Sequence, residues 1–522
     1  MSVNDGATLG GIGTVGTTTV ASGGRLAPGN SIGTLSVDGD LTLAAGSTYD
    51  VEIAGNGSSD RVDVGGKATV TGSHVAVTAL DPETSYQSGQ TYRILTAGSG
   101  VVGNFADVVT QSAFLDLQLD ERANAVDLTI KVKDLTPDPG AHPLFGTVPG
   151  TRNQLATADA LDELQQSGPQ LALYNALLML NAGQARAAFD QLSGEVHASA
   201  GVLLLDDSRF LRDAVTERLR AAFEGVGAAT LPVMAYGEGG PELAAAASER
   251  FAAWGSVFGS WGTADADGNA ASLKHDIGGL LMGVDGQAFE TWRLGIVAGY
   301  SHTSFAARDR AASGSSDNYH LGVYAGTTRG RLGLRSGLAY TWHDIDTARA
   351  VAFPGFAERL TGDYRAGTFQ SFGELGYRID AQVVSFESFA NLAYVNLRTA
   401  AFAEQGSAAA LRGAGQTTDA TFTTLGMRAQ TDVVLGDVPA TARGMLGWRH
   451  AFGDVTPTAA LAFASGETFA VAGTPIARNA AVIEAGLDIA LSPNATLGLA
   501  FAGQLANRAS DNGFKVDLSV RF

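Results

Sequence analysis

The last ten residues of the chain, Gly-Phe-Lys-Val-Asp-Leu-Ser-Val-Arg-Phe (513–522), alternate strictly between apolar and polar side chains. Successive side chains of a strand point to opposite faces, so this stretch predicts a β-strand with one apolar and one polar face. A closing strand that ends on an aromatic residue is typical of a transmembrane β-barrel, whose last strand pairs with its first. We therefore expect one set of side chains to face lipid: Phe514, Val516, Leu518, Val520 and Phe522.

Composition limits what the chain can do. A length of 522 residues predicts two or three domains. No apolar run of about 18 residues is present, so a membrane-spanning part would have to be a barrel of strands. The formal charge of −19 and the lack of any Lys/Arg run argue against nucleic-acid binding. The chain has no cysteine, which excludes disulfides, thiolate catalysis and cysteine zinc sites.

The start of the chain, residues 1–7, has neither the basic residues nor the apolar segment of a secretory signal peptide. A secreted protein without one is either mature or truncated, and because glycine-rich repeats follow Met1 directly, we expect a truncation or gene fragment.

The carboxy-terminal half repeats the alternating pattern. Each segment is long enough to cross a bilayer as a tilted strand, for which about 9–11 residues suffice. Connections between them are alternately long and short, as in outer-membrane barrels with extracellular loops and periplasmic turns. A soluble β-sandwich also alternates, but its strands are shorter. We predict twelve strands: 251–261, 273–289, 291–306, 316–329, 331–345, 366–380, 382–398, 417–435, 438–453, 477–492, 495–505 and 513–522.

Charged residues of these segments fall on the face opposite the apolar one. Arg293 and Arg335 lie between apolar residues of the third and fifth segments, and Glu484 and Asp488 lie on the tenth. We expect these four side chains to face the lumen, to solvate it, and to contact any helix that it holds.

The middle of the chain is helical. Residues 206–220 form an amphipathic pattern for which Asp206 or Asp207 is a candidate N-cap. Such a helix is more often a core element, but its place just ahead of a barrel also suits a helix in the pore, over about residues 195–224. The residues that we expect in the pore are Arg209, Phe210, Arg212, Val215, Arg218 and Leu219.

The amino-terminal third consists of short β runs separated by glycine-rich corners. This spacing favours a parallel β-helix, in which each coil stacks on the previous one, over a flexible Gly/Ser linker. Pro137, Pro139 and Pro143 then indicate a linker to the helical region. The runs are Leu35–Val37, Leu41–Leu43, Tyr49–Ile53, Val62–Val64, Val75–Val77, Tyr92–Leu95, Leu115–Leu119 and Val126–Val132.

Together these features resemble an autotransporter of type V secretion. The matching stretches are residues 26–35 (Leu-Ala-Pro-Gly-Asn-Ser-Ile-Gly-Thr-Leu), 191–199 (Gln-Leu-Ser-Gly-Glu-Val-His-Ala-Ser), 207–212 (Asp-Ser-Arg-Phe-Leu-Arg) and the closing strand. The resemblance implies a passenger β-helix end with a folding-promoting tail over 1–135. It further implies a linker and helical region over 136–244 and a translocator barrel over 245–522.

The same resemblance implies an outer-membrane anchor that exports and displays its own passenger at the cell surface. Its implied partners are membrane lipid, periplasmic chaperones and the barrel-assembly machinery, which would read the final strand and Phe522. We expect one barrel per monomer. The helix lacks the Asn-Asn pair that some members use for self-cleavage, so we predict that the passenger stays attached.

Two motifs resemble chemical sites but lack a part that the chemistry needs. Residues 29–33 fit a G-x-S-x-G pattern, but β runs rather than a helix follow the serine. Residues 265–269 resemble the start of a calcium loop without its later glutamate. We therefore predict no catalytic, cofactor-binding or metal-binding residue and no enzymatic activity of this chain. Two other functions stay open: a surface adhesin that binds host or surface ligands through residues 1–135, and a carrier of an enzyme domain upstream of Met1.

Overall fold

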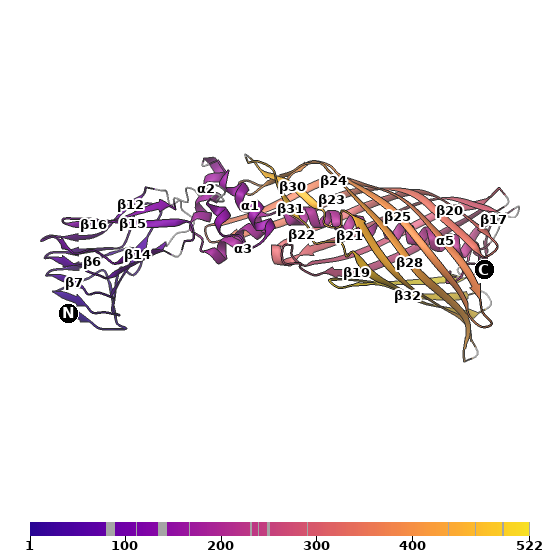
Figure 1. Cartoon of the computed structure of the whole chain (residues 1–522), viewed down its shortest axis with the longest axis horizontal. Coiled ribbons are helices and arrows are strands. Elements are labelled where there is room, and N and C mark those ends of the chain that lie inside the picture. Colours follow the sequence, from indigo (N-terminus) through magenta and orange to yellow (C-terminus); the bar gives the residue numbers. More distant parts are fainter. Residues whose placement is uncertain are drawn as a thin grey trace.

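The computed structural model describes residues 1–79, 89–110, 112–133, 144–165, 167–229, 232–237, 240–247, 251–289, 291–436, 438–464, 466–492 and 495–520. Three parts follow one another along the long axis of the molecule: a stack of short strands, a group of helices and a long barrel (Figure 1). Some residues named above lie outside the described part, namely Pro137, Pro139, Pro143, Phe522 and the side chains of Val516, Leu518 and Val520.

The amino-terminal part is a parallel β-helix, as predicted. Parallel pairs join each strand to the strand three places further along the chain, for example β5 to β8 and β8 to β11. The first sheet comprises β1 (Ser2–Val3), β4 (Thr18–Val20), β7 (Leu41–Leu43), β10 (Ala68–Thr69) and β13 (Val101–Val102). The second comprises β2 (Thr8–Gly11), β5 (Arg25–Pro28), β8 (Thr48–Ile53), β11 (His74–Ala79) and β14 (Asp107–Thr110). The third comprises β3 (Thr14–Val15), β6 (Thr34–Val37), β9 (Arg61–Val64), β12 (Thr91–Ala97), β15 (Leu115–Arg122) and β16 (Ala125–Val132).

Alternation explains the interior of this β-helix. Every second side chain of a strand points inward, and Leu35, Tyr49 and Val62 are 0–1% exposed. At the base of the stack β16 pairs antiparallel with both β12 and β15. This antiparallel pair ends the parallel winding just before the helical region.

The helices comprise η1 (Phe145–Thr147), α1 (Arg152–Asp162), α2 (Gly168–Leu178), α3 (Ala182–Leu192), α4 (Glu195–Asp207) and α5 (Arg209–Ala222). The Thr151 side chain caps α1 by accepting from the Gln154 amide, and Asn181 and Gln184 form a capping box on α3. None of the helices formed by described residues is long and apolar enough to cross a membrane.

The prediction that Asp206 or Asp207 caps a helix is wrong. Ser208, between α4 and α5, has helical dihedral angles (φ −53°, ψ −21°), and no side chain caps α5. Both aspartates therefore stand in the last turn of α4, where their carboxylates are free to bind groups of the barrel wall.

The predicted twelve-stranded antiparallel barrel is confirmed. It closes where β19 pairs with β34, from Gly259 opposite Phe514 to Ala264 opposite Ala509. The strands of the wall are β19 (Phe251–Ala264), β20 (Leu273–Ala288), β21 (Trp292–Ala307), β22 (Ala312–Arg329), β23 (Leu332–Phe353), β24 (Phe356–Asp380), β25 (Ser385–Thr399), β28 (Gln416–Leu435), β29 (Val438–Gly453), β32 (Asn479–Ser492), β33 (Ala495–Ala506) and β34 (Ala509–Val520).

The outer face of the wall is apolar. Ile296 and Leu338 are 54% and 51% exposed, and exposed Tyr and Trp side chains stand further along the same strands. Neighbouring residues on these strands, such as Arg293, are buried in the interior. This is the lipid-out arrangement that the alternation predicts.

The structure differs from the sequence expectation in the long loops. Residues 346–365, expected to form a loop, continue β23 and β24 as one hairpin to the pair Phe353 and Phe356. The expected loops 399–416 and 454–476 contain β26 (Phe402–Ala403), β27 (Leu411–Gly413), β30 (Thr458–Phe463) and β31 (Phe469–Ala472), which form a separate four-stranded sheet, called the loop sheet below. The remaining elements are η2 (Arg308–Arg310) and a hairpin, β17 (Val233–Gly237) and β18 (Gly240–Ala244), that pairs with the start of β19.

Candidate functional site

The lumen of the barrel holds a helix. Figure 1 shows α5 inside the wall of strands, far from the β-helix. Its arginines, Arg209, Arg212, Arg218 and Arg220, are only 4–8% exposed. Buried guanidinium groups require hydrogen-bonding or ionic partners, and most of those found here come from the surrounding strands.

Asp285 on β20 gathers the first group of partners. Its carboxylate accepts two hydrogen bonds from Arg218 of α5, both 2.8 Å long, and it also binds Arg293 of β21. Tyr324 donates its hydroxyl to the same carboxylate at 2.7 Å and in turn accepts from the Trp254 indole at 2.6 Å. One buried aspartate therefore ties the pore helix to β21 and β22, and through Tyr324 to β19.

A second group lies within the wall itself. Arg335 on β23 and Arg428 on β28 each bind both Glu374 on β24 and Glu387 on β25, at 2.8–2.9 Å for the salt bridges. The guanidinium of Arg428 also stands 3.7 Å from the centre of the Phe389 ring. This stacking gives the inward-facing Phe389 ring a cationic partner next to the buried Glu387.

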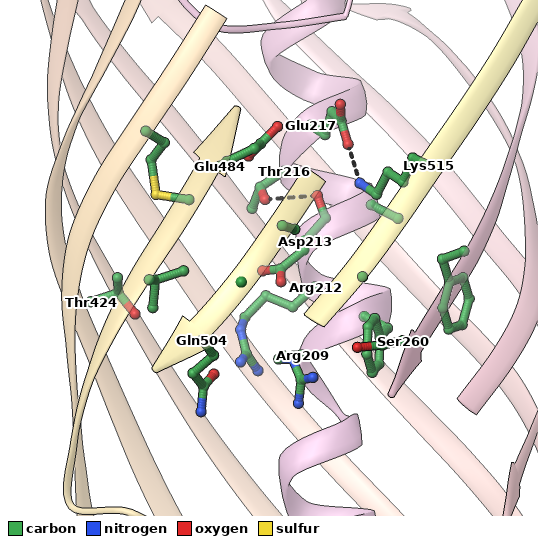
Figure 2. A pocket seen from close by; sticks show the side chains of 18 of the residues that line it. Arg209, Arg212, Asp213, Thr216, Glu217, Ser260, Thr424, Glu484, Gln504 and Lys515 are labelled. Atoms are coloured by element: carbon green, nitrogen blue, oxygen red, sulfur yellow. Dashed lines mark hydrogen bonds and ion pairs between the residues drawn. The ribbon is translucent and has the colours of Figure 1, made fainter. Parts of the chain in front are cut away.

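A third group joins α5 to the closing strand. Glu217 accepts a 2.7 Å hydrogen bond from Lys515 of β34, as Figure 2 shows, and a 3.3 Å bond from Arg443 of β29. Arg443 also reaches Glu484 at 3.2 Å and Asp488 at 3.5 Å on β32. The helix is thus bound to β29 and to the closing strand β34.

The junction of α4 and α5 makes the fourth group. Asp206 binds Arg449 of β29 at 2.7 Å and also Arg209, which reaches Asp511 of β34 at 2.8 Å. Asp207 accepts from the Thr303 hydroxyl at 2.9 Å. The two aspartates that were expected to cap a helix therefore bind residues of the barrel wall instead.

Apolar packing fills the space between the charged groups. Leu211, Val215 and Leu219 of α5 are at most 2% exposed and belong to one cluster with side chains of the wall. The Phe210 ring stacks on Phe258 of β19 at a centroid distance of 4.9 Å. A cavity of about 140 Å³ remains beside the helix, and Arg209, Arg212, Asp213 and Glu217 line it together with strand residues (Figure 2).

At the barrel mouth on the side of the β-helix, α4 has its own network of polar contacts (Figure 1). His197 lies 3.0 Å from Glu404 and 3.2 Å from the Tyr364 hydroxyl, and its side chain is 1% exposed. Glu404 also binds Arg349 of β23 through both oxygens, at 2.6 and 2.7 Å. Both ends of the helical segment are therefore fixed to the wall.

The structure brings the predicted lumen residues together. All six pore-helix candidates lie on α5 inside the barrel, and Arg293, Arg335, Glu484 and Asp488 all take part in the ion-pair groups above. Five further residues of these groups were not predicted from the sequence, although each stands at an inward position of its strand: Asp285, Glu374, Glu387, Arg428 and Arg443.

The structure also shows where the G-x-S-x-G motif and the calcium-loop-like motif lie. Residues 29–33 are followed by the strand β6 rather than by a helix, as expected. In residues 265–269, the Asp267 carboxylate accepts from the Asn269 and Ala270 amides, and the Asn269 side chain accepts from the Asn153 amide. This loop therefore contacts the start of α1. Among the described residues no group of three or more His, Asp or Glu side chains is arranged for a metal ion.

The structure describes the side chains of the closing strand as far as Lys515. Phe514 is 55% exposed on the outer face and stacks near Trp261 of β19, at a centroid distance of 5.8 Å. Its neighbour Lys515 points to the lumen. The role of the strand as an assembly signal stays a prediction.

Comparison with known proteins gives a family match and two similar curated relatives. Residues 253–502 match the family model described as Autotransporter beta-domain. Two curated relatives, each named Extracellular serine protease and both from Serratia marcescens, are 36% and 34% identical to the chain. The matches cover 100% and 95% of this chain but 52% and 49% of the relatives. The chain thus spans about half the length of the curated relatives it matches.

Solved structures similar to this chain include the translocator domain of autotransporter NalP from Neisseria meningitidis, at 16% identity and a TM-score of 0.44. That match covers 62% of this chain and 100% of the other. The β domain of the Bordetella autotransporter Brka is 17% identical with a TM-score of 0.36, covering 52% and 98% of the two chains.

Proposed function

Since residues 253–502 belong to the autotransporter β-domain family, and the barrel is an outer-membrane translocator, we propose that it exports and displays the amino-terminal segment of its own chain. The proposed cargo includes residues 1–135, and the proposed domain limits are those expected from the sequence: 1–135, 136–244 and 245–522.

The path of the chain carries this proposal. The β-helix lies beyond one mouth of the barrel, and the closing strand β34 ends at the other (Figure 1). Between the β-helix and the first wall strand, the chain runs through the lumen as α4 and α5. A segment that begins outside one mouth and reaches its barrel through the pore is the arrangement left by export through that barrel.

Folding of the β-helix supplies a driving force for this export. Its interior buries side chains such as Leu26, Leu41 and Val75 completely. Burial of apolar surface is favourable by about 25 cal/mol per Å². Folding outside the membrane therefore opposes return of the chain into the pore.

Three partners belong to the proposal. The apolar outer face requires membrane lipid, and a barrel that closes on itself fits a monomer. We further propose that periplasmic chaperones hold the chain before insertion and that the barrel-assembly machinery binds the final strand. We also propose that the passenger stays attached after export.

Export is tested with the full chain behind a bacterial signal peptide and an epitope tag before residue 1. We expect the tag to be degraded when protease is added to intact cells, and to be absent from the culture medium. A matched chain that ends at residue 244 lacks the barrel and should leave the tag protected in the periplasm. Equal surface exposure of both chains would refute the proposal.

The names of the two curated relatives favour a second candidate. Both are extracellular serine proteases about twice as long as this chain. The β-helix and barrel would then serve as the carrier of a protease domain that precedes residue 1 in a longer protein. Sequencing the gene upstream of the codon for Met1 tests this directly, and a stop codon or a signal peptide immediately upstream would contradict it.

A further inference from the structure

The seam of the barrel, where the first wall strand β19 meets the closing strand β34, is paired along only part of its length. The pairs between the two strands run from Ala264 opposite Ala509 to Gly259 opposite Phe514. Beyond Phe514, β34 continues to Val520 and pairs with β33 on its other side. Among the described residues, no strand pairs with the seam-side edge of β34 after Phe514.

The start of β19 is instead paired with a hairpin. The strand β17 runs antiparallel to β19, from Met234 opposite Ala253 to Tyr236 opposite Phe251. Figure 1 shows β17 near the C-terminus, at the barrel mouth away from the β-helix. If the ladder between β19 and β34 continued in its register, it would place Val520 opposite Ala253. The hairpin and the end of the closing strand therefore require the same edge of β19.

The strand β17 has the side-chain pattern of a wall strand. Met234 and Tyr236 are 39% and 48% exposed, whereas Val233 and Ala235 are at most 5% exposed. The Tyr236 ring lies 6.4 Å from the exposed ring of Phe251, measured between centroids. Apolar side chains on one face and small buried ones on the other fit a wall between lipid and lumen. At this end of β19, β17 thus takes the position of the closing strand.

The second strand of the hairpin does not continue the wall. β18 has Pro241 and Glu242 at exposed positions. Proline has no amide hydrogen to donate, and a charged side chain discourages further pairing at a sheet edge. Within the described part of the chain, β18 pairs with β17 and with no other strand. Completing the seam therefore requires the hairpin to leave the edge of β19.

The cavity beside α5 reaches the seam where its pairing stops. Ser256 and Gly259 of β19 and Phe514 and Lys515 of β34 line this cavity together with residues of the helix. Phe514 belongs to the outer face and Lys515 to the lumen, so the cavity extends into the wall itself. Figure 2 shows Lys515 at the cavity, hydrogen-bonded to Glu217. A seam paired along its full length would separate the two faces.

From this competition we propose that the hairpin β17–β18 is a temporary partner of β19, and that the end of the closing strand displaces it to complete the barrel. In the completed seam, Val520 stands opposite Ala253 and Phe522 opposite Phe251. Unpaired backbone groups at a strand edge are unfavourable in lipid, so the longer ladder of β34 is preferred once the barrel is in the membrane. This inference concerns closure of the wall and is independent of the proposed export function.

Introduced cysteines distinguish the two states, because the chain has no natural cysteine. Met234→Cys and Ala253→Cys form a disulfide when the hairpin is paired, whereas Ala253→Cys and Val520→Cys form one when the seam is complete. Residues directly opposite in an antiparallel pair have Cα atoms about 4.5–5.5 Å apart, which is within the range of a disulfide. A chain with all three substitutions can form only one of these bonds at a time.

The full chain with the three cysteines is expressed behind a signal peptide under reducing conditions, pulse-labelled, and oxidised briefly at set times. We expect the 234–253 bond to dominate early. Once the barrel shows its heat-dependent shift in electrophoretic mobility, the 253–520 bond should be about tenfold more abundant, because the longer ladder adds backbone hydrogen bonds. A constant ratio of the two bonds, or a 234–253 bond that stays dominant in the heat-modifiable barrel, would overturn the inference.

A variant of the hairpin tests the competition directly. Ala235→Pro removes a ladder hydrogen bond from β17, which is paired on both sides, and should make the 253–520 bond appear about fivefold earlier. The matched control is Ala244→Pro at the end of β18, where the partner is Val233 of the hairpin itself. Equal timing in the two variants would contradict the competition. If Ala235→Pro abolishes the mobility shift, the time course of the three-cysteine chain without proline decides.

Discussion

Lys515 of the closing strand donates a 2.7 Å hydrogen bond to Glu217 of the pore helix, across 298 residues of sequence. The same strand contributes Asp511, which binds Arg209, the first residue of α5. The strand that closes the barrel is therefore also one of the strands that hold the helix. The closure of the barrel wall and the position of the helix in the lumen therefore depend on the same two ion pairs.

The first prediction concerns this pair. Lys515→Met leaves the Glu217 carboxylate with Arg443 as its remaining cation at hydrogen-bonding distance. Loss of a charged partner at a largely buried site costs about 1–3 kcal/mol. We expect a lower unfolding midpoint in detergent, measured by the heat-dependent shift in electrophoretic mobility. Lys274→Met, at an exposed lysine of β20, is the control, and equal midpoints for the two variants would contradict the coupling.

The second prediction concerns Asp285. Asp285→Asn removes the charge that Arg218 and Arg293 share, and both guanidinium groups stay buried. An uncompensated buried charge costs about 3–5 kcal/mol, so the helix should leave the lumen more often. We expect larger and more frequent openings in planar-bilayer conductance recordings of the full chain. Asp317→Asn, at a more exposed aspartate of β22, should leave the recordings unchanged; a closed Asp285→Asn pore would show that other pairs suffice.

The fold was accessible from sequence wherever lipid and lumen impose alternation. One face of each wall strand contacts lipid hydrocarbon and the other faces the polar lumen. Apolar and polar residues therefore alternate along the strand, and this alternation can be recognised in the local sequence. The loop sheet lacks this signal. Its strands have two to six residues, and the apolar side chains of Leu461 and Phe469 are covered by helices some 300 residues away in sequence. Only the tertiary structure reveals what buries them.

The site was accessible in part for the same reason. Alternation placed Arg293 and Glu484 on the lumen face, but pairing depends on strand register and on the rotation of α5, which local patterns do not contain. The cap expected at Asp206 failed because the helix continues through Ser208. A carboxylate near a helix start predicts a cap only if the chain before it is not itself helical.

A third prediction follows from Asp60 in the β-helix. This carboxylate is 1% exposed and accepts from the Gly33 and Glu52 amides, both at 2.9 Å. Burial raises its pKa from 3.8 to about 6. The folded state thus binds the proton more tightly than the unfolded state, so this group stabilises folding most below about pH 4. That contribution is lost as the pH rises through 6.

Hydrogen exchange measures this effect. After correction for intrinsic exchange, the amides of Gly33 and Glu52 should be better protected at pH 5 than at pH 7.5 in the full chain. Asp60→Asn should remove the difference, whereas Asp38→Asn, at an exposed aspartate of the same β-helix, should retain it. Better protection at pH 7.5 would reverse the sign and refute the assignment.

The last prediction concerns Gly194, which precedes α4 with φ at +66°. A side chain there is disfavoured by the left-handed backbone, which costs about 1–2 kcal/mol for a residue with a Cβ atom. The added Cβ would also meet the Leu411 side chain and lie 2.9 Å from Leu461 Cδ1, both on the loop sheet. Gly194→Ala should therefore loosen the contact between the loop sheet and the helices while the wall strands keep their pairing.

We expect Gly194→Ala to speed proteolysis of residues 1–192 at the cell surface and to leave the heat-dependent mobility of the barrel unchanged. The matched control is Gly183→Ala on α3, where φ is ordinary and the site is exposed. Alanine favours a helix over glycine there, so proteolysis should be unchanged or slower. If both variants behave alike, the geometry at Gly194 does not couple α4 to the loop sheet, and the barrel mouth tolerates a side chain at the start of α4.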